Sequence, residues 1–393
     1  MSNGRPNGGS RAGAIALVVA ALGAIGVVTE ALHDPARALL AWVAAYGFGV
    51  GTALGALLLA MIFHVTGARW PLVVRPRLMS VATTLPIFAV LFVPIALGLH
   101  HVFPWARDTS HLEAPVQAVL EHQRMWNEPT FFLARSGFYL ATWSFLALLL
   151  RRADAAHERA PSTLTRARQR RISGAGLPIV ALTMTFASFD WFMSLEPGWV
   201  SNAYGLYFFC GGLVSAISLV AILAWTSQRS ESEDTSLGPS HFHALGRLML
   251  MSVVLWAYIG FFQFMLVWVG DLPREVTFFV ARSRGSFLVI DAVLVLGHFA
   301  LPFLALLPRP AKRRAGTLAL IAGWLVLMDA VDVAWLVLPA GGDHVRLLDA
   351  APFLVVSGLA FAHGARRFGT RALRTNGAAR DPELVESLEY TSS

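Results

Sequence analysis

Continuous apolar runs separated by short polar segments fill nearly all of this 393-residue chain. A helix needs about 20 mostly apolar residues to cross a hydrocarbon core about 30 Å thick. Runs that are continuously apolar, not alternating, argue against a membrane β-barrel. We therefore predict an all-α, polytopic integral membrane protein with about ten transmembrane helices. The predicted spans are 12–29, 38–65, 78–99, 131–150, 175–194, 200–226, 244–268, 285–307, 315–338 and 346–365.

Composition and charge agree with a membrane location. Hydrophobic residues make up 56% of the chain and charged residues only 14%, far from the average of soluble proteins. The formal net charge is +7, but the basic residues fall in short loops, which indicates topology and not nucleic-acid binding. Loops 151–171 and 309–314 carry most of the bias. We expect a multi-pass protein, surrounded by membrane lipids, with both termini in the cytoplasm.

Cysteine and histidine usage limits the cofactors. The chain has one cysteine, Cys210, so iron–sulfur clusters held by four cysteines and covalently attached haem c are excluded within this chain. No span carries two histidines thirteen or fourteen residues apart, which disfavours haem b. We predict no metal site and no covalently bound cofactor. The histidines near predicted helix ends, which would be the candidate haem b ligands, are His64, His100, His101 and His363.

Several acidic residues lie inside the apolar spans, where they are costly. A carboxylate at the bilayer centre costs about 2.5–3.5 kcal/mol on insertion scales, so such residues usually have a role. With a rise of 1.5 Å per residue, Asp190 lies about 22 Å from the cytoplasmic edge, and Asp329 and Asp332 about 21 and 25 Å. Asp291 lies about 9 Å below the outer edge. The acids therefore gather in the outer half of the membrane.

The spacing of these residues predicts a proton route. Asp329 and Asp332 are three residues apart and share a helix face. Two like charges in a low dielectric resist joint ionisation, which leaves one site ready to take or release a proton. Asp291 and His298, seven apart, share a face two turns along another helix. The predicted route consists of Asp190, Asp291, His298, Asp329 and Asp332; the alternative is that the acids only hold helices together, for example by pairing with Arg135.

The stretch SFDWFMSLEPGW, residues 188–199, ends a predicted span with two acids at the membrane rim. Asp190 and Glu196 there are candidates to receive a quinol hydroxyl proton, and Arg135 is at a similar depth. These three residues form the predicted quinone-proximal site, for menaquinone or ubiquinone. The alternative is a rim anchor without chemistry.

Two other patterns have structural interpretations. Trp191 and Trp199 fit the aromatic belt at a membrane surface. The glycine-rich stretch Gly47–Gly55 is embedded in apolar sequence, so it predicts close helix packing and not phosphate binding.

The motifs together resemble a known family. The chain contains HHVFPWAR, NEPTFFLARSGFY, SFDWFMSLEPGW followed by YGLYFFCGG, then FFQFMLVWVGDLPRE, RGSF, LPFLALLPRPAKR and DVAWLVLP. Over about residues 40–340 these segments resemble the F-type membrane subunit of alternative complex III. That complex is a bacterial quinol:cytochrome c oxidoreductase, and the subunit is similar to polysulfide-reductase-like (NrfD-like) membrane anchors.

The resemblance implies a division of the chain into two four-helix bundles flanked by peripheral helices. Residues 1–37 would hold the cytoplasmic N-terminus and first transmembrane helix, 38–199 the first bundle, 200–340 the second, and 341–393 the last helix and cytoplasmic tail. The implied partners are a homologous C-type membrane subunit, an iron–sulfur subunit and cytochrome c subunits in a bacterial inner membrane.

Two acids carry over by position. Asp190 matches the family's acid in the SFD motif, and Asp332 matches the acid before its tryptophan-containing LP ending. The loop VARSRGSF, 280–287, departs from the expected aspartate–arginine pattern, and Asp329 stands where a basic or aromatic residue is expected.

We therefore expect a subunit without a redox cofactor of its own in a quinol-oxidising respiratory complex. It would contribute a quinone-proximal site, a proton pathway, or both. Two other interpretations stay open: a proton- or sodium-coupled secondary transporter, and a purely structural membrane anchor.

Overall fold

The computed structural model describes residues 8–109, 114–229, 237–368 and 382–391, which are helical and contain no strand. Ten helical spans within them are long and apolar enough to cross a membrane, so the chain is an all-α, multi-pass membrane protein. The spans are Arg11–His33, Pro35–Thr66, Arg75–Leu97, Pro129–Arg159, Thr163–Leu195, Tyr204–Gln228, Pro239–Gly270, Gly285–Leu306, Ala315–Gly341 and Leu347–Gly364.

Several spans consist of more than one helix, and short helices lie between some of them. The α-helices are α1 (Gly8–His33), α2 (Pro35–Thr66), α3 (Arg75–Ala82), α4 (Leu85–Leu91), α5 (Val93–Leu97), α6 (Leu99–Val102), α7 (Ala114–His122), α8 (Pro129–Arg159), α9 (Thr163–Trp191), α10 (Tyr204–Arg229), α11 (Pro239–Gly270), α12 (Pro273–Arg282), α13 (Gly285–Val293), α14 (Leu301–Leu306), α15 (Arg309–Arg313), α16 (Ala315–Val337), α17 (Ala351–Phe368) and α18 (Pro382–Leu388).

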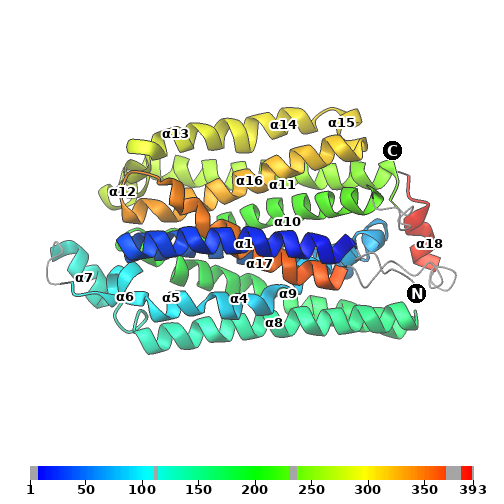
Figure 1. Ribbon diagram of the computed structural model, residues 1–393, viewed down its shortest axis with the longest axis horizontal. Coiled ribbons are helices and arrows are strands. Elements are labelled where there is room, and N and C mark those ends of the chain that lie inside the picture. The colour runs from blue at the N-terminus through cyan, green and yellow to red at the C-terminus, as the bar shows by residue number, and fades with distance from the viewer. Residues whose placement is uncertain (1–7, 110–113, 230–236, 369–381, 392–393) are drawn as a thin grey trace.

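The long helices lie side by side, and both chain ends lie at the same end of the molecule (Figure 1). We call this the terminal end; α15 and α18 also lie there. The opposite end, where α7 and α12 lie, is called the loop end.

For the description of contacts, spans two to five are called the first group and spans six to nine the second group. In the first group α2 and α8 both pack against α9, and α4 packs against α8. In the second group α10 packs against α11 and α16, and α14 packs against α11. Because α2 also packs along α10 and α16, it joins the two groups. The pair α1 and α17 packs together and against α2, outside both groups (Figure 1).

Glycines bring α2 and α10 into backbone contact. A Cβ atom added to Gly55 would lie 2.3 Å from the Gly212 carbonyl oxygen, and one added to Gly212 would lie 2.3 Å from that of Gly51. Only glycine leaves room for this approach, as in small-residue interfaces of other membrane helices. The close packing predicted for the glycine-rich stretch is confirmed.

Two spans are interrupted. The third span breaks between α3 and α4 at Thr83 and Thr84, and again at Phe92 before α5. Pro86 and Pro94 sit near the starts of α4 and α5, where a missing N–H is tolerated. The eighth span is π-helical from Leu294 to Ala300. The breaks are in the second span of one group and the third span of the other.

A buried ion pair fixes α1 and α17 at the loop end. The Arg37 guanidinium donates to Asp349 Oδ1 at 2.9 Å and to Oδ2 at 2.5 Å, and both side chains are only 3% exposed. Arg37 also donates to the carbonyls of Leu338 and His344. The start of α2, the segment that follows α16 and the segment that precedes α17 therefore meet at one guanidinium.

The turn between α1 and α2 carries a second, more exposed pair. Asp34 caps α2 by accepting from the Arg37 backbone N–H at 3.0 Å, and its other oxygen accepts from Arg346 at 3.0 Å. The first of these bonds, helped by Arg346, lowers the pKa of the Asp34 carboxyl. The cap therefore stays ionised to a lower pH than a free aspartate would.

Candidate functional site

Asp190, at the loop end of α9, is held by four donors. Its Oδ1 accepts from Trp126 Nε1 at 2.8 Å and from Arg135 Nη2 at 2.9 Å. Its Oδ2 accepts from Arg135 Nε at 3.0 Å and from the Tyr139 hydroxyl at 2.9 Å. The Arg135 guanidinium also lies over the Trp126 ring, 4.1 Å from the ring centre.

This geometry gives Asp190 a full set of hydrogen bonds and an adjacent positive charge. A bidentate arginine–carboxylate pair is among the stronger charge-assisted contacts, and breaking one when buried is costly. The pair ties α8 to α9. Asp190 therefore pairs with Arg135, as in the alternative in which the acids only hold helices together.

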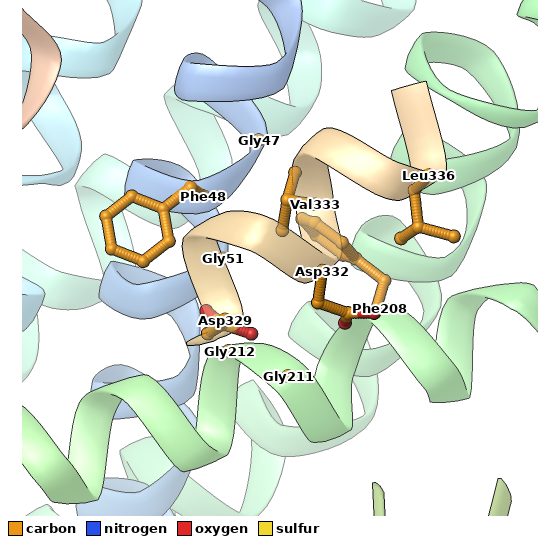
Figure 2. A pocket seen from close by; sticks show the side chains of 10 residues that line it. All are labelled: Gly47, Phe48, Gly51, Phe208, Gly211, Gly212, Asp329, Asp332, Val333 and Leu336. Carbon is orange, nitrogen blue, oxygen red and sulfur yellow. The ribbon is translucent and has the colours of Figure 1, made fainter. Parts of the chain in front are cut away.

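Asp329 and Asp332 on α16 form the second acidic group, and they face α10 (Figure 2). A Cβ atom added to Gly211 would lie 2.6 Å from Asp329 Oδ1 and 3.7 Å from Asp332 Oδ2, so both carboxyls reach the same glycine. The predicted acid pair is therefore present in space as well as in sequence. Each side chain is 1% exposed.

Among the described residues, hydroxyl and indole groups donate hydrogen bonds to this pair, and no cation forms an ion pair with it. Asp332 accepts from the Tyr207 hydroxyl at 2.5 Å and from Trp256 Nε1 at 3.0 Å. Asp329 Oδ2 accepts from the Ser215 hydroxyl at 2.5 Å, while Asp329 Oδ1 has no partner within the described chain. Two buried carboxylates without a counter-charge repel each other in a low dielectric.

A small cavity lies between α2, α10 and α16, beside the two acids (Figure 2). Its volume is about 10 Å³, which is close to the least that holds one water molecule. The carboxyl oxygens are its polar wall. The lining residues are Gly47, Phe48, Gly51, Phe208, Gly211, Gly212, Asp329, Asp332, Val333 and Leu336.

His298 lies next to this group, inside the π-helical segment. Its ring stacks on Trp256 with the ring centres 4.0 Å apart, and Trp256 in turn donates to Asp332. His298 is fully buried, and neither ring nitrogen has a hydrogen-bond partner among the described residues. Short π segments occur frequently at functional sites.

Asp291 lies on α13, before the π-helical segment that contains His298. The two-turn spacing assumed an uninterrupted α-helix, but the span changes to π-helix at Leu294, and this changes which side chains share a face. Asp291 is only partly buried and lies within electrostatic range of Arg282 and Trp335.

Glu196 pairs with an arginine that sequence reasoning did not select. Arg282 Nη2 donates to Glu196 Oε1 at 2.6 Å, and Arg282 is fully buried, whereas the Glu196 side chain is 21% exposed. Arg282 also donates to the carbonyls of Trp335 and Leu336 and so caps the end of α16. Tyr204, fully buried in the same region, interacts electrostatically with Glu196, Arg282 and Asp332.

The two tryptophans near this end are not a surface belt. Trp191 is 1% exposed and donates to the Ser136 hydroxyl at 2.9 Å. Trp199 is 3% exposed and stacks on Phe278 with centres 3.8 Å apart. The belt interpretation is wrong for both, because helix packing covers the residues that end α9.

One polar cluster was missed from the sequence. At the terminal end, Asp154 Oδ1 contacts His64 Nε2 at 3.1 Å and accepts from Gln169 Nε2 at 2.7 Å, and all three side chains are buried. The residues come from α2, α8 and α9, so no local spacing could reveal them. No hydrogen-bond chain within the described residues links this cluster to Asp329 and Asp332.

The described residues contain no group of three or more His, Cys, Asp or Glu side chains placed to hold a metal ion. No protein-family model and no curated protein matches this chain. The functional assignment therefore depends on the residues and their geometry.

Proposed function

We propose that this chain is the F-type membrane subunit of a bacterial alternative complex III, a quinol:cytochrome c oxidoreductase, and that its second bundle conducts protons. The observation that carries the proton role is the buried Asp329–Asp332 pair without a counter-cation, beside a cavity the size of one water. The assignment to the complex is supported by the motifs that resemble that family.

In this proposal the acid pair is the proton-holding site and the loop end is the exit. Asp329 Oδ1, which lacks a donor among the described residues, takes a proton from water in the cavity. Asp332 then passes one on while Tyr207 holds its Oδ1 in place. Tyr204 interacts electrostatically with both Asp332 and Glu196, and these residues continue the proposed path to the partly exposed Glu196.

The remaining parts of the proposal concern the setting of the chain. The terminal end faces the cytoplasm of a bacterial inner membrane, because the basic loops lie there. The electrons of menaquinol or ubiquinol leave through metal centres on the C-type, iron–sulfur and cytochrome c partners. Within this chain Asp190 and Arg135 hold helices together, and Glu196 is the acid nearest to the released protons.

Substitution of the acid pair tests the proposal in the assembled complex. Asp329→Asn and Asp332→Asn should each slow proton-coupled quinol:cytochrome c turnover at least about tenfold, since positioned acid–base groups commonly contribute 10²–10⁴-fold. Assembly should be retained, because no buried cation loses its partner. Proton release per electron is measured with a pH dye, and Asp343→Asn, an exposed acid at the loop end, is the matched control.

Normal turnover and normal proton release in both variants would leave only an anchoring role. Proton- or sodium-driven solute uptake by the purified chain in vesicles would instead indicate a transporter. Many transporters have interrupted spans at matching places in their two halves. Among the described helices the interrupted spans are the third and the eighth, which take different places in the two proposed bundles.

A further inference from the structure

The last described helix, α18, is attached to the terminal end of the molecule by a small set of contacts (Figure 1). The Ser387 hydroxyl donates to the Trp70 carbonyl at 3.0 Å, and the Ser387 carbonyl lies 2.7 Å from His241 Nε2. The Tyr390 ring contacts the rings of Trp70 and His241, with ring centres 6.1 and 5.7 Å apart. We call residues 382–390 the strap.

The strap contacts both groups of spans. Trp70 begins the short 3₁₀ helix η1 (Trp70–Val73), which follows α2 in the first group, whereas His241 lies in the first turn of α11 in the second group. Ser387 sits between them and is fully buried. The hydrogen bonds of one serine therefore tie the terminal ends of the two groups together.

The attachment is small enough to be reversible. A helix of seven residues is not stable by itself in water, so α18 is helical because it is docked. The ion pair between Arg69 and Glu386 adds little, since both side chains are more than half exposed. Segments held by few buried contacts open at a free energy far below that of global unfolding. A modest change in free energy can therefore shift the strap between docked and released states.

The hydrogen bonds of His241 fix its protonation state while the strap is docked. Nδ1 accepts from the Gly238 backbone N–H at 3.1 Å, so the proton is on Nε2, which donates to the Ser387 carbonyl. An imidazolium carries a proton on both nitrogens and cannot accept from Gly238. His241 is 1% exposed, and a buried charge without a partner is costly. Docking therefore requires the neutral ring.

The neighbouring elements offer no ion-pair partner to a protonated His241 within the described chain. Arg69 and Glu386 pair with each other, and the contact with Tyr390 is between rings. The cations of α15 lie within electrostatic range of His243, two residues further along α11. The charged groups on these elements are Arg69 before η1, Glu386 and Glu389 on the strap, and Arg309, Lys312 and Arg313 on α15.

We propose that the strap is a pH-sensitive clasp, which docks across the two groups while His241 is neutral and detaches when His241 takes up a proton. Detachment lets water reach the imidazolium and unties η1 from α11. Histidine is the side chain suited to such a switch, because its charge changes near neutral pH.

The direction of the pH dependence follows from the proton count. The docked state binds one proton fewer than the released state, so acid favours release. Docking is fully favoured above the ordinary pKa of histidine, about 6.5, and weakens as the pH falls below it.

Hydrogen exchange of the full-length chain in detergent tests the clasp. The readout is the protection of the amides of residues 384–390, relative to the exchange rate of an unstructured chain at the same pH. In the wild type this protection should fall about tenfold per pH unit below about pH 6.5, since one proton is taken up on release. In His241→Gln it should be retained and independent of pH, because the glutamine amide can donate to the Ser387 carbonyl and does not titrate.

Glu386→Gln is the matched control, since it removes a titratable acid of the strap and leaves His241 in place. Its protection should keep the pH dependence of the wild type. Four results would overturn the proposal: an unprotected strap at every pH, pH-independent protection in the wild type, equal pH dependence in His241→Gln, or loss of the pH dependence in Glu386→Gln. The wild type and Glu386→Gln decide the question even if His241→Gln does not dock. These readouts do not depend on turnover of the respiratory complex.

Discussion

Asp190 and Asp332 have nearly the same neutral hydrogen-bond donors but different charge environments. Each accepts from one tyrosine hydroxyl and one tryptophan indole, Tyr139 and Trp126 for Asp190 and Tyr207 and Trp256 for Asp332. Only Asp190 also has an arginine. A bidentate arginine supplies the counter-charge of a buried carboxylate and fixes its position, whereas a carboxylate without a counter-charge is suited to proton exchange.

This difference predicts opposite effects of the same substitution. Asp190→Asn leaves the buried Arg135 without its counter-charge, so it should destabilise the chain by about 3–5 kcal/mol. Asp332→Asn leaves no buried cation behind and should change stability much less. Both are measured as unfolding free energies of the purified chain in the same detergent.

A double variant separates the charge from the shape of the Asp190 site. Asp190→Asn/Arg135→Gln removes both charges and should recover part of the lost stability, because the uncompensated arginine is the main cost. Equal destabilisation by Asp190→Asn and Asp332→Asn would contradict the assignment of different roles to the two acids.

The sequence predicted the acid pair but not its surroundings. The three-residue spacing of Asp329 and Asp332 on one apolar run was enough to place both on one helix face. The partners of these acids come from other helices, as do Arg282 for Glu196 and His64 for Asp154. Pairings across many tens of residues leave no trace in local spacing.

At the scale of helices, the contact between α2 and α10 depends on the absence of side chains. Gly212→Ala would place a Cβ atom 2.3 Å from the Gly51 carbonyl oxygen, and this contact is with backbone, which cannot rotate away. The substitution should destabilise the chain by about 1–3 kcal/mol or more, as overpacking does. Because the acid pair faces the adjacent Gly211, the Gly212→Ala substitution should also disturb the cavity.

Gly323→Ala is the matched control for that substitution. Gly323 lies on α16, and a Cβ atom there would meet nothing within 4 Å. This variant should be neutral or stabilising by about 0.5–1 kcal/mol, the usual gain of alanine over glycine in a helix. Equal destabilisation in both variants, measured by thermal unfolding, would show that the α2–α10 contact is not specifically tight.

Hydropathy located the ten spans but could not resolve their internal breaks. A window of about 20 residues averages over a single turn, so it cannot distinguish the π-helical turn at Leu294–Ala300 from regular α-helix. In the third span, Pro86 and Pro94 lie at the starts of α4 and α5, where a proline ends the preceding helix locally. In the eighth span Pro302 lies at the start of α14, directly after the π-helical segment.

At the scale of the whole molecule, the peripheral pair α1 and α17 is attached to the bundles through the buried Arg37–Asp349 pair. Asp349→Asn removes the counter-charge of Arg37 and should destabilise this attachment by about 3–5 kcal/mol. Hydrogen exchange should then increase in α17 while exchange in α8 and α9 stays as in the wild type, because those helices pack elsewhere.

The control for this variant is Arg346→Gln. The Arg346 side chain is 50% exposed although its partner Glu30 is buried, and a pair with one exposed member contributes less than the fully buried Arg37–Asp349 pair. Exchange in α17 should stay near the wild-type rate. Faster exchange of the same size in both variants would mean that the surface pair, and not the buried one, holds the peripheral helices.

The central position of α2 also sets an order for synthesis. Its glycine face binds α10, which the ribosome produces about 160 residues after Gly51, or roughly 8–30 s later at usual elongation rates. During that interval only lipid or an insertion factor can cover the glycine face of α2. Slow translation between residues 66 and 204 would therefore prolong the most vulnerable stage of biogenesis.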